Sequence, residues 1–191
     1  MPAKLSLRHL QERQLAHDRD YHKDIWILST ADTVKHMALH HAKYVGSLIE
    51  AQEKNDTSRI EKIIVDAFVI ALATANALQQ DLAASVPQQS GGSTDFISSY
   101  AKNVGKLAKA CEAQDHVEDF PIRKQMQQSN VDILGVIVAA AQERGLDIAE
   151  RYEARLRQVE QKSMFDGTFQ RAAAQKSLKE KPKSWRKPPT P

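Results

Sequence analysis

The sequence predicts an all-α fold built from two helical hairpins in tandem. Apolar residues recur at spacings of three and four along most of the chain, and no stretch alternates with the period of two typical of strands. In addition, residues 42–53 and 101–112 share Ala, Lys, Val, Gly, Leu, Ala and Glu at equivalent positions, displaced by 59 residues. These observations indicate a duplicated helical unit.

A second similarity follows each copy. Val65-Asp66 and the apolar run that ends at residues 81–83 match Val131-Asp132 and the run that ends at residues 147–149, at an offset of 66. The larger offset is expected if the second copy has the longer turn between its two helices. Each copy is therefore predicted to be a helical hairpin.

Composition limits the class of protein and its compartment. A chain of 191 residues with 41% apolar and 27% charged residues is typical of a soluble globular protein with a real core. The lone Cys111 excludes an internal disulfide and fits a reducing compartment. No apolar run approaches the ~20 residues of a membrane span, and no N-terminal signal pattern is present. We therefore expect a cytoplasmic protein without a membrane partner.

The first half of the chain is divided into two units. Residues 1–30 contain a helix over residues 5–19 and a connector whose apolar residues 25–28 are expected to pack into the core. Residues 31–86 form the first repeat, with one helix over residues 33–54, capped by Thr30 or Asp32. The capping-box pattern from Ser58 to Glu61 predicts the start of a second helix, which runs to Val86 and is the central buried helix.

The second half repeats this plan after a linker at residues 87–94. Residues 95–163 form the second repeat, with a helix over residues 95–113, a polar loop, and an apolar helix from Ile122. A break at residues 145–147 precedes a charged terminal helix. Residues 164–191 are a basic, proline-rich tail that is expected to be disordered when alone and could contact nucleic acid or an acidic protein.

Two aspartates lie within apolar runs. Asp66 follows Ile63-Ile64-Val65, and Asp132 lies between Val131 and Ile133. A buried carboxylate must be paired, bound to metal or protonated, because leaving it unpaired costs several kcal/mol. Either these aspartates pair with Lys43 and Lys102 or cap a neighbouring helix, or they belong to a site.

Two histidines share one face of the first predicted hairpin. His36 and His40 are four residues apart, and Lys43 and Tyr44 continue the same face. If that face meets Asp66, two imidazoles and a carboxylate form an open transition-metal site, with Asp132 as the metal ligand of the second copy. The alternative is that both histidines are packing or surface residues.

Residues 39–46, Val65-Asp66 and residues 75–82 resemble the MazG-like, all-α nucleoside triphosphate pyrophosphohydrolases. The resemblance covers residues 33–86 and, more faintly, 96–162. It implies four acids in Glu-x-x-Glu and Glu-x-x-Asp helices that hold Mg²⁺ or Mn²⁺ while an NTP is cleaved to NMP and pyrophosphate. Two such hairpins in one chain resemble a fused form of the family's dimer, so we expect an internal pseudo-dimer with a four-helix core and extra N- and C-terminal helices.

The chain departs from the family pattern at most of the acid positions. His41, Tyr44 and Ile63 occupy three of them in the first copy, where only Asp66 remains; the second copy has Tyr100, Asn103 and Ser129, with Asp132. One acid is too few for a stable magnesium site. We therefore expect a degenerate protein with a nucleotide-binding or regulatory role.

Two alternatives remain beside this expectation. One is an active pyrophosphohydrolase with an altered metal set that uses His36, His40 and Asp66. The other is a non-catalytic interaction module, with self-association among its possible contacts. Four basic residues could bind the phosphates of a nucleotide: Lys43, Lys102, Arg155 and Arg171.

Overall fold

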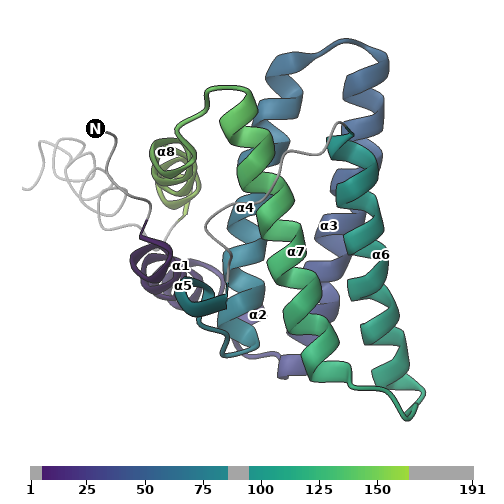
Figure 1. The fold of residues 1–191 in the computed structure, drawn as a ribbon. Helices are drawn as coiled ribbons and strands as arrows, with labels where there is room; N and C mark the ends of the chain where they lie inside the picture. The colour runs from purple at the N-terminus through teal and green to yellow at the C-terminus, as the bar shows by residue number, and fades with distance from the viewer. Residues whose placement is uncertain (1–5, 86–94, 164–191) are drawn as a thin grey trace, which may run out of the picture.

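The computed structural model describes residues 6–85 and 95–163, and this part of the chain is all-α with no strand (Figure 1). The all-α prediction is confirmed. The predicted linker at residues 87–94 and the tail at residues 164–191, which includes Arg171, lie outside the described residues. None of the described helices is long and apolar enough to cross a membrane.

Four long helices form the central bundle. They are α3 (Thr30–Glu53), α4 (Thr57–Ala77), α6 (Phe96–Asp115) and α7 (Ile122–Glu143). Helix α3 packs against α4 and α6, and α7 packs against the other side of the same two helices, so the four make a closed ring of contacts. Their apolar faces meet in one core that includes Leu48, Phe68, Leu107 and Ile137.

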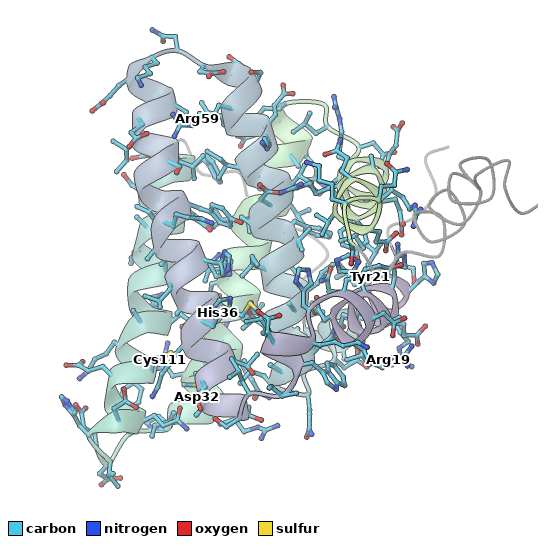
Figure 2. The ribbon with its side chains drawn as sticks, turned by 180° about the vertical axis from the view of Figure 1, so that it is seen from behind. Arg19, Tyr21, Asp32, His36, Arg59 and Cys111 are labelled. Carbon is cyan, nitrogen blue, oxygen red and sulfur yellow. The ribbon has the colours of Figure 1, made fainter. Side chains whose placement is uncertain are left out.

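The remaining helices surround α4. Helix α1 (Leu7–Tyr21) and helix α8 (Ile148–Glu160) both pack on α4 and touch each other, as Figures 1 and 2 show from opposite sides. The short helices α2 (Lys23–Trp26) and α5 (Leu82–Ser85) follow α1 and α4. Because α4 is covered by α1, α3, α7 and α8, it is the central helix that its apolar sequence predicted.

All four bundle helices end in the same way. The second residue after each helix has a positive φ: Asn55, Gln79, Val117 and Gly145. The next amide donates a hydrogen bond to a carbonyl in the last turn of the helix, for example Glu118 N to Ala113 O at 3.0 Å. This is the Schellman arrangement, which satisfies carbonyls that the helix leaves unpaired.

Three sequence predictions about helix ends are wrong. Helix α3 is capped by Ser29 rather than Thr30 or Asp32, and α4 by Asp56, whose carboxylate accepts from Arg59 N at 3.0 Å, rather than by Ser58. Helix α4 ends at Ala77 instead of Val86 because the chain turns at Gln79, where φ is 52°.

The connector between α1 and α3 is not part of the core. Trp26 is 49% exposed and Ile27 is 80% exposed, although both were expected to be buried. The chain forms α2 here, and Trp26 lines a cavity between the helices, whereas Ile27 is not among the residues of that cavity. The break predicted at residues 145–147 is correct, and Asp147 caps α8.

Candidate functional site

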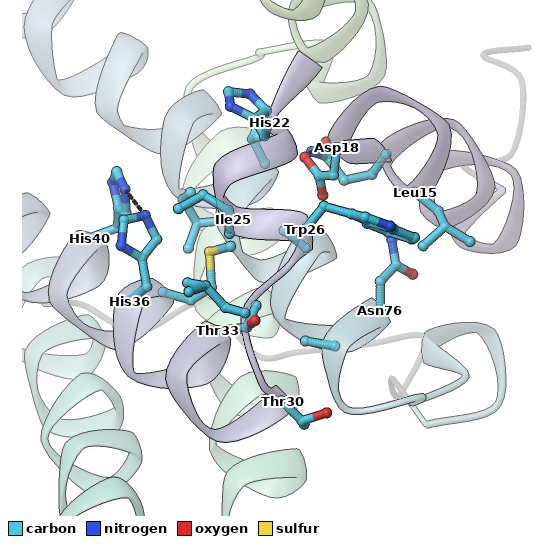
Figure 3. A pocket seen from close by; sticks show the side chains of 17 residues that line it. Leu15, Asp18, His22, Ile25, Trp26, Thr30, Thr33, His36, His40 and Asn76 are labelled. Atoms are coloured by element: carbon cyan, nitrogen blue, oxygen red, sulfur yellow. Dashed lines mark hydrogen bonds between the residues drawn. The ribbon is translucent and has the colours of Figure 1, made fainter. Parts of the chain in front are cut away.

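A cavity of about 310 Å³ lies between α1, α2, α3 and α4 (Figure 3). Its apolar wall comes from residues on all four helices, among them Leu15, Trp26, Met37 and Val69. Polar side chains also line it: Gln14, Asp18, His22, His36, His40 and Asn76. A mostly apolar cavity with a few polar groups is the usual form of a small-molecule site.

The predicted histidine pair lies at this cavity and is hydrogen-bonded. The Nε2 atoms of His36 and His40 are 3.1 Å apart (Figure 3). Lys43 Nζ lies 3.3 Å from His40 Nδ1. Burial, together with the nearby charge of Lys43, lowers the pKa of His40. A neutral His40 that accepts from Lys43 at Nδ1 donates from Nε2 to His36, so the three side chains form a chain of hydrogen bonds.

Asp66 does not join this pair. Its carboxylate accepts a hydrogen bond from Arg155 Nε of α8 at 2.5 Å, and its side chain is 15% exposed. In the described ranges, only one group of three ligand residues has its atoms within 4.8 Å of one another, and it contains neither Asp66 nor His36 and His40. The structure thus pairs Asp66 with arginine.

Asp132 is less buried than its apolar neighbours indicated. Its side chain is 33% exposed, it accepts from Gln128 Nε2 at 2.8 Å, and Lys106 Nζ lies 3.7 Å away. The predicted pairing of the two aspartates with Lys43 and Lys102 is therefore wrong. Lys102 is exposed on α6, and Asp132 instead faces a lysine one helical turn further along.

The residues that the sequence analysis aligned with the acid positions of the MazG-like pattern lie in or beside the core. His41 and Tyr100 are fully buried, and the ring nitrogen Nδ1 and the hydroxyl oxygen are 2.7 Å apart. Ile63, Asn103 and Ser129 are also buried. Burial lowers the pKa of His41 to about 3. Because these side chains stabilise the bundle from inside, they are not available as ligands.

Tyr44 is the exception among these positions. It is partly buried, and Lys43 Nζ lies 4.6 Å from the centre of its ring. Burial and then the charge of Asp66 raise the pKa of Tyr44 to about 12. Tyr44 therefore stays neutral, with Lys43 on one side and the Asp66–Arg155 pair near it.

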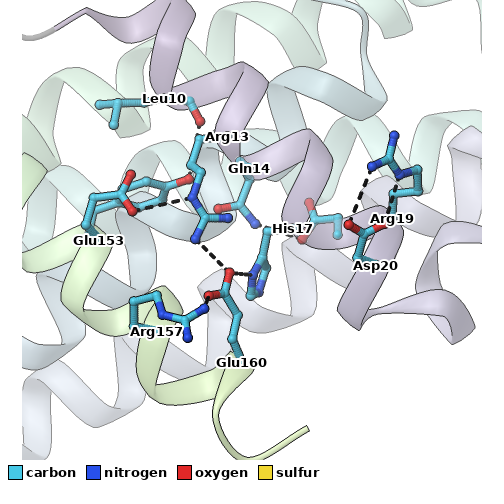
Figure 4. A network of polar contacts seen from close by, with 11 residues as sticks. Leu10, Arg13, Gln14, His17, Arg19, Asp20, Glu153, Arg157 and Glu160 are labelled. Atoms are coloured by element: carbon cyan, nitrogen blue, oxygen red, sulfur yellow. Dashed lines mark hydrogen bonds and ion pairs between the residues drawn. The ribbon is translucent and has the colours of Figure 1, made fainter. Parts of the chain in front are cut away.

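A second polar cluster joins α1 to α8 (Figure 4). Glu160 accepts from Arg13 Nη2 at 2.7 Å, its Oε1 lies 3.0 Å from His17 Nδ1, and Arg157 also contacts it. Burial opposes the charge of Glu160, but the hydrogen bonds with His17 and Arg13 lower its pKa. Glu160 is therefore a buried, ionised carboxylate held by three basic side chains.

Beside this cluster, His17, Asp18 and His22 bring their ligand atoms together. Each offers one atom within 4.8 Å of the others. Desolvation lowers the pKa of both histidines and raises the pKa of Asp18 to about 7. The sequence analysis did not predict this group because it looked for metal ligands only within the predicted hairpins. The available signal was two histidines and an aspartate within the six residues 17–22, at the end of a helix.

Comparison of the chain with family models, with curated proteins and with solved structures finds no match in any of the three.

Proposed function

We propose that this chain is a degenerate MazG-like protein that binds a nucleotide without hydrolysing it. The observation that supports this most directly is the Asp66–Arg155 pair at 2.5 Å. The one acid that remains from the family pattern is neutralised by a guanidinium, whereas hydrolysis requires several acids around a metal ion. The other acid positions of the first copy hold His41, Tyr44 and Ile63.

The arrangement of the helices agrees with an internal pseudo-dimer of two MazG-like hairpins, α3–α4 and α6–α7. His41 and Tyr100, which are in contact, occupy equivalent positions of the two copies at the 59-residue displacement. Contact between equivalent residues is expected near a twofold axis that relates the copies. The left-handed residues Gln79 and Gly145 also differ by 66, the displacement of the second similarity.

The cavity has the features that a nucleotide would use. Its volume of about 310 Å³ is at the lower end of small-molecule pockets. The half-exposed ring of Trp26 offers a face for base stacking. Lys43, which contacts His40 at the cavity, supplies a cation for the phosphates. Arg155 is the second candidate phosphate ligand; it lines a separate pocket with Lys62 and Arg151, and a phosphate would have to compete with Asp66 for it.

The test measures binding and turnover on the same protein. Each NTP and dNTP is added with Mg²⁺ or Mn²⁺, thermal unfolding is recorded, and the nucleotides are separated by ion-exchange chromatography. At 100 times Kd, a bound nucleotide stabilises the fold by ~2.7 kcal/mol. We expect a raised Tm with the nucleotide recovered intact.

Matched variants connect the effect to the cavity. Trp26→Ala and Lys43→Gln are expected to reduce the nucleotide-induced shift, whereas Lys102→Gln, the equivalent exposed position in the second copy, is not. An unchanged Tm at saturating nucleotide would contradict the proposal. Monophosphate and pyrophosphate produced by the wild type but not by Asp66→Ala would instead establish the active enzyme.

A role as an interaction module is the second candidate, and one observation favours it. Trp26, Ile27 and Leu28 expose 49%, 80% and 39% of their surface in a single apolar segment. Such exposed apolar segments are typical of contacts with another protein or a second copy. If the segment mediates self-association, Ile27→Asp is expected to shift the concentration-dependent mass in sedimentation to that of the monomer.

A further inference from the structure

We propose that His17, Asp18 and His22 form a binding site for a divalent transition metal such as zinc, with free coordination positions that open into the cavity. This site does not depend on nucleotide binding. The three residues lie at the junction of α1 and α2, where the chain changes direction after Tyr21. The distances, the surrounding hydrogen bonds and the donor types each support it.

The distances suit a single ion. One ligand atom from each residue lies within 4.8 Å of the other two, and the rings of His17 and His22 have centroids 5.1 Å apart. Ligands at ~2.1 Å from a tetrahedral ion are ~3.4 Å from one another. The separations exceed this distance by at most ~1.4 Å, a gap that we expect rotation of the side chains to close.

The hydrogen bonds around the group hold two of its ligands in place. His17 is 1% exposed, and its Nδ1 lies 3.0 Å from Glu160 Oε1, which leaves Nε2 as the ring nitrogen for a metal. A carboxylate behind a ligating imidazole is the usual support of a protein metal site, since it fixes the tautomer and orientation of the ring. The buried Gln14 donates to Asp18 Oδ1 at 2.7 Å and leaves Oδ2 for the ion.

The donor set indicates the class of metal. Two imidazole nitrogens and one carboxylate oxygen suit zinc and its first-row neighbours, whereas Mg²⁺ and Ca²⁺ prefer oxygen ligands alone. Three protein ligands leave at least one position open, as in catalytic rather than structural zinc sites. Asp18 and His22 both line the cavity, so a molecule in the cavity is within reach of that position (Figure 3).

The experiment uses the full chain, stripped with a chelator and titrated with Co²⁺, whose visible absorption reports nitrogen and oxygen coordination. We expect saturation at one ion per chain and competition by Zn²⁺. His22→Ala and Asp18→Asn, both at partly exposed positions, are expected to weaken Co²⁺ binding at least tenfold. Glu160→Gln, which alters the support of His17, is expected to weaken it 10- to 100-fold.

Two controls separate this site from other histidines. His9→Ala changes an exposed histidine of the same helix, and the double variant His36→Ala/His40→Ala removes the other histidine pair of the cavity; both are expected to retain the wild-type titration. Circular dichroism of every variant verifies folding. Absence of the Co²⁺ band, its persistence in His22→Ala and Asp18→Asn, or its loss only in the His36/His40 variant would overturn the proposal.

Discussion

At the scale of single residues, the most consequential contact joins His41 and Tyr100 in the middle of the bundle. Both side chains are fully buried, and they share one hydrogen bond of 2.7 Å. In the described part of the chain, His41 Nε2 has no hydrogen-bond partner. A polar group in such surroundings is costly when charged, so the core requires the neutral imidazole.

The neutral His41 predicts a specific dependence of stability on pH. Its pKa is about 3 in the folded protein and 6.5 in the unfolded chain, so below pH 6.5 only the unfolded chain takes up the proton. The contribution of His41 to the free energy of unfolding is therefore at its maximum above pH 6.5. It falls as the pH decreases towards 3, by up to ~1.4 kcal/mol per pH unit. Urea denaturation at several pH values measures the slope.

The control for this prediction uses a second histidine. His41→Gln is expected to be less stable at pH 7. Its free energy of unfolding is also expected to depend less on pH, by the contribution of one proton. His116→Gln, at an exposed position on the α6–α7 turn, is expected to keep the wild-type slope. Equal slopes in the wild type and His41→Gln would show that His41 does not remain neutral in the fold.

Sequence predicted which residues need a partner or share a helix face, but not which distant residue the partner is. The sequence predicted that a carboxylate inside an apolar run needs a partner, and Asp66 has one. The partner, Arg155, is 89 residues away on the charged terminal helix, where sequence analysis offered it as a phosphate ligand. Helical spacing also placed His36 and His40 together correctly, but it contains no information on which distant side chain faces them.

At the scale of helices, the conformation of the helix ends shows where the fold imposes strain on the backbone. The four bundle helices all terminate through a left-handed residue, yet only Gly145 is a glycine. Val117 adopts φ 53° despite its branched side chain, which is disfavoured by contact between Cβ and the backbone. The α6–α7 turn therefore keeps its shape because the flanking helices impose it.

Replacement of Val117 by glycine is expected to stabilise the protein. The side chain is 87% exposed, so little packing is lost, and relief of the left-handed strain is expected to raise the free energy of unfolding by ~1 kcal/mol. Gly145→Ala is the opposite case: no atom lies within 4 Å of the added Cβ, so its expected loss of ~1 kcal/mol comes from the backbone alone. Urea denaturation measures both. A less stable Val117→Gly would mean that the valine side chain contributes packing that outweighs the strain.

Sequence patterns located the helices well and their ends less well. The four bundle helices follow from apolar spacing, since burial of one face requires it. Asp56 and Ser58 both satisfy the rules for a cap, and the choice between them depends on where the turn from α3 leaves the chain. The early end of α4 depends on Gln79, a residue type that gives no sign of a left-handed conformation.

At the scale of the whole molecule, α1 and α8 enclose α4 and meet through Glu160. This carboxylate contacts His17 and Arg13 of α1 as well as Arg157 of its own helix. The contact spans 143 residues from His17 to Glu160. Sequence alone does not indicate such a pairing, because both helices read as charged covers of the repeats.

Loss of the charge at Glu160 is expected to weaken the packing of α1 and α8 against each other. Glu160→Gln keeps the size of the side chain but leaves Arg13 and Arg157 without their buried counter-charge, which predicts a loss of ~2 kcal/mol in the free energy of unfolding. Glu153→Gln is the matched control on the same helix. Its partly exposed side chain makes one ion pair of 3.4 Å with Arg13, so a change below ~0.5 kcal/mol is expected. Similar losses in the two variants would exclude a special role for Glu160.

Hydrogen exchange locates the effect of Glu160→Gln within the molecule. Amides of α1 and α8 are expected to exchange faster in this variant, while those of α6, which lies opposite α4 in the ring of bundle helices, keep their protection. Faster exchange of the amides in all helices would show that α1 and α8 unfold together with the four-helix bundle.

The His41–Tyr100 contact has a further consequence for the pseudo-dimer that we propose. Two identical hairpins would place identical residues on the axis between them, whereas here a histidine meets a tyrosine. Two histidines or two tyrosines at this point would differ in volume and in hydrogen bonding from the pair that fills it. In the proposed pseudo-dimer each half is therefore matched to its neighbour rather than to itself, so the halves, produced as separate polypeptides, are expected to select each other over their own kind.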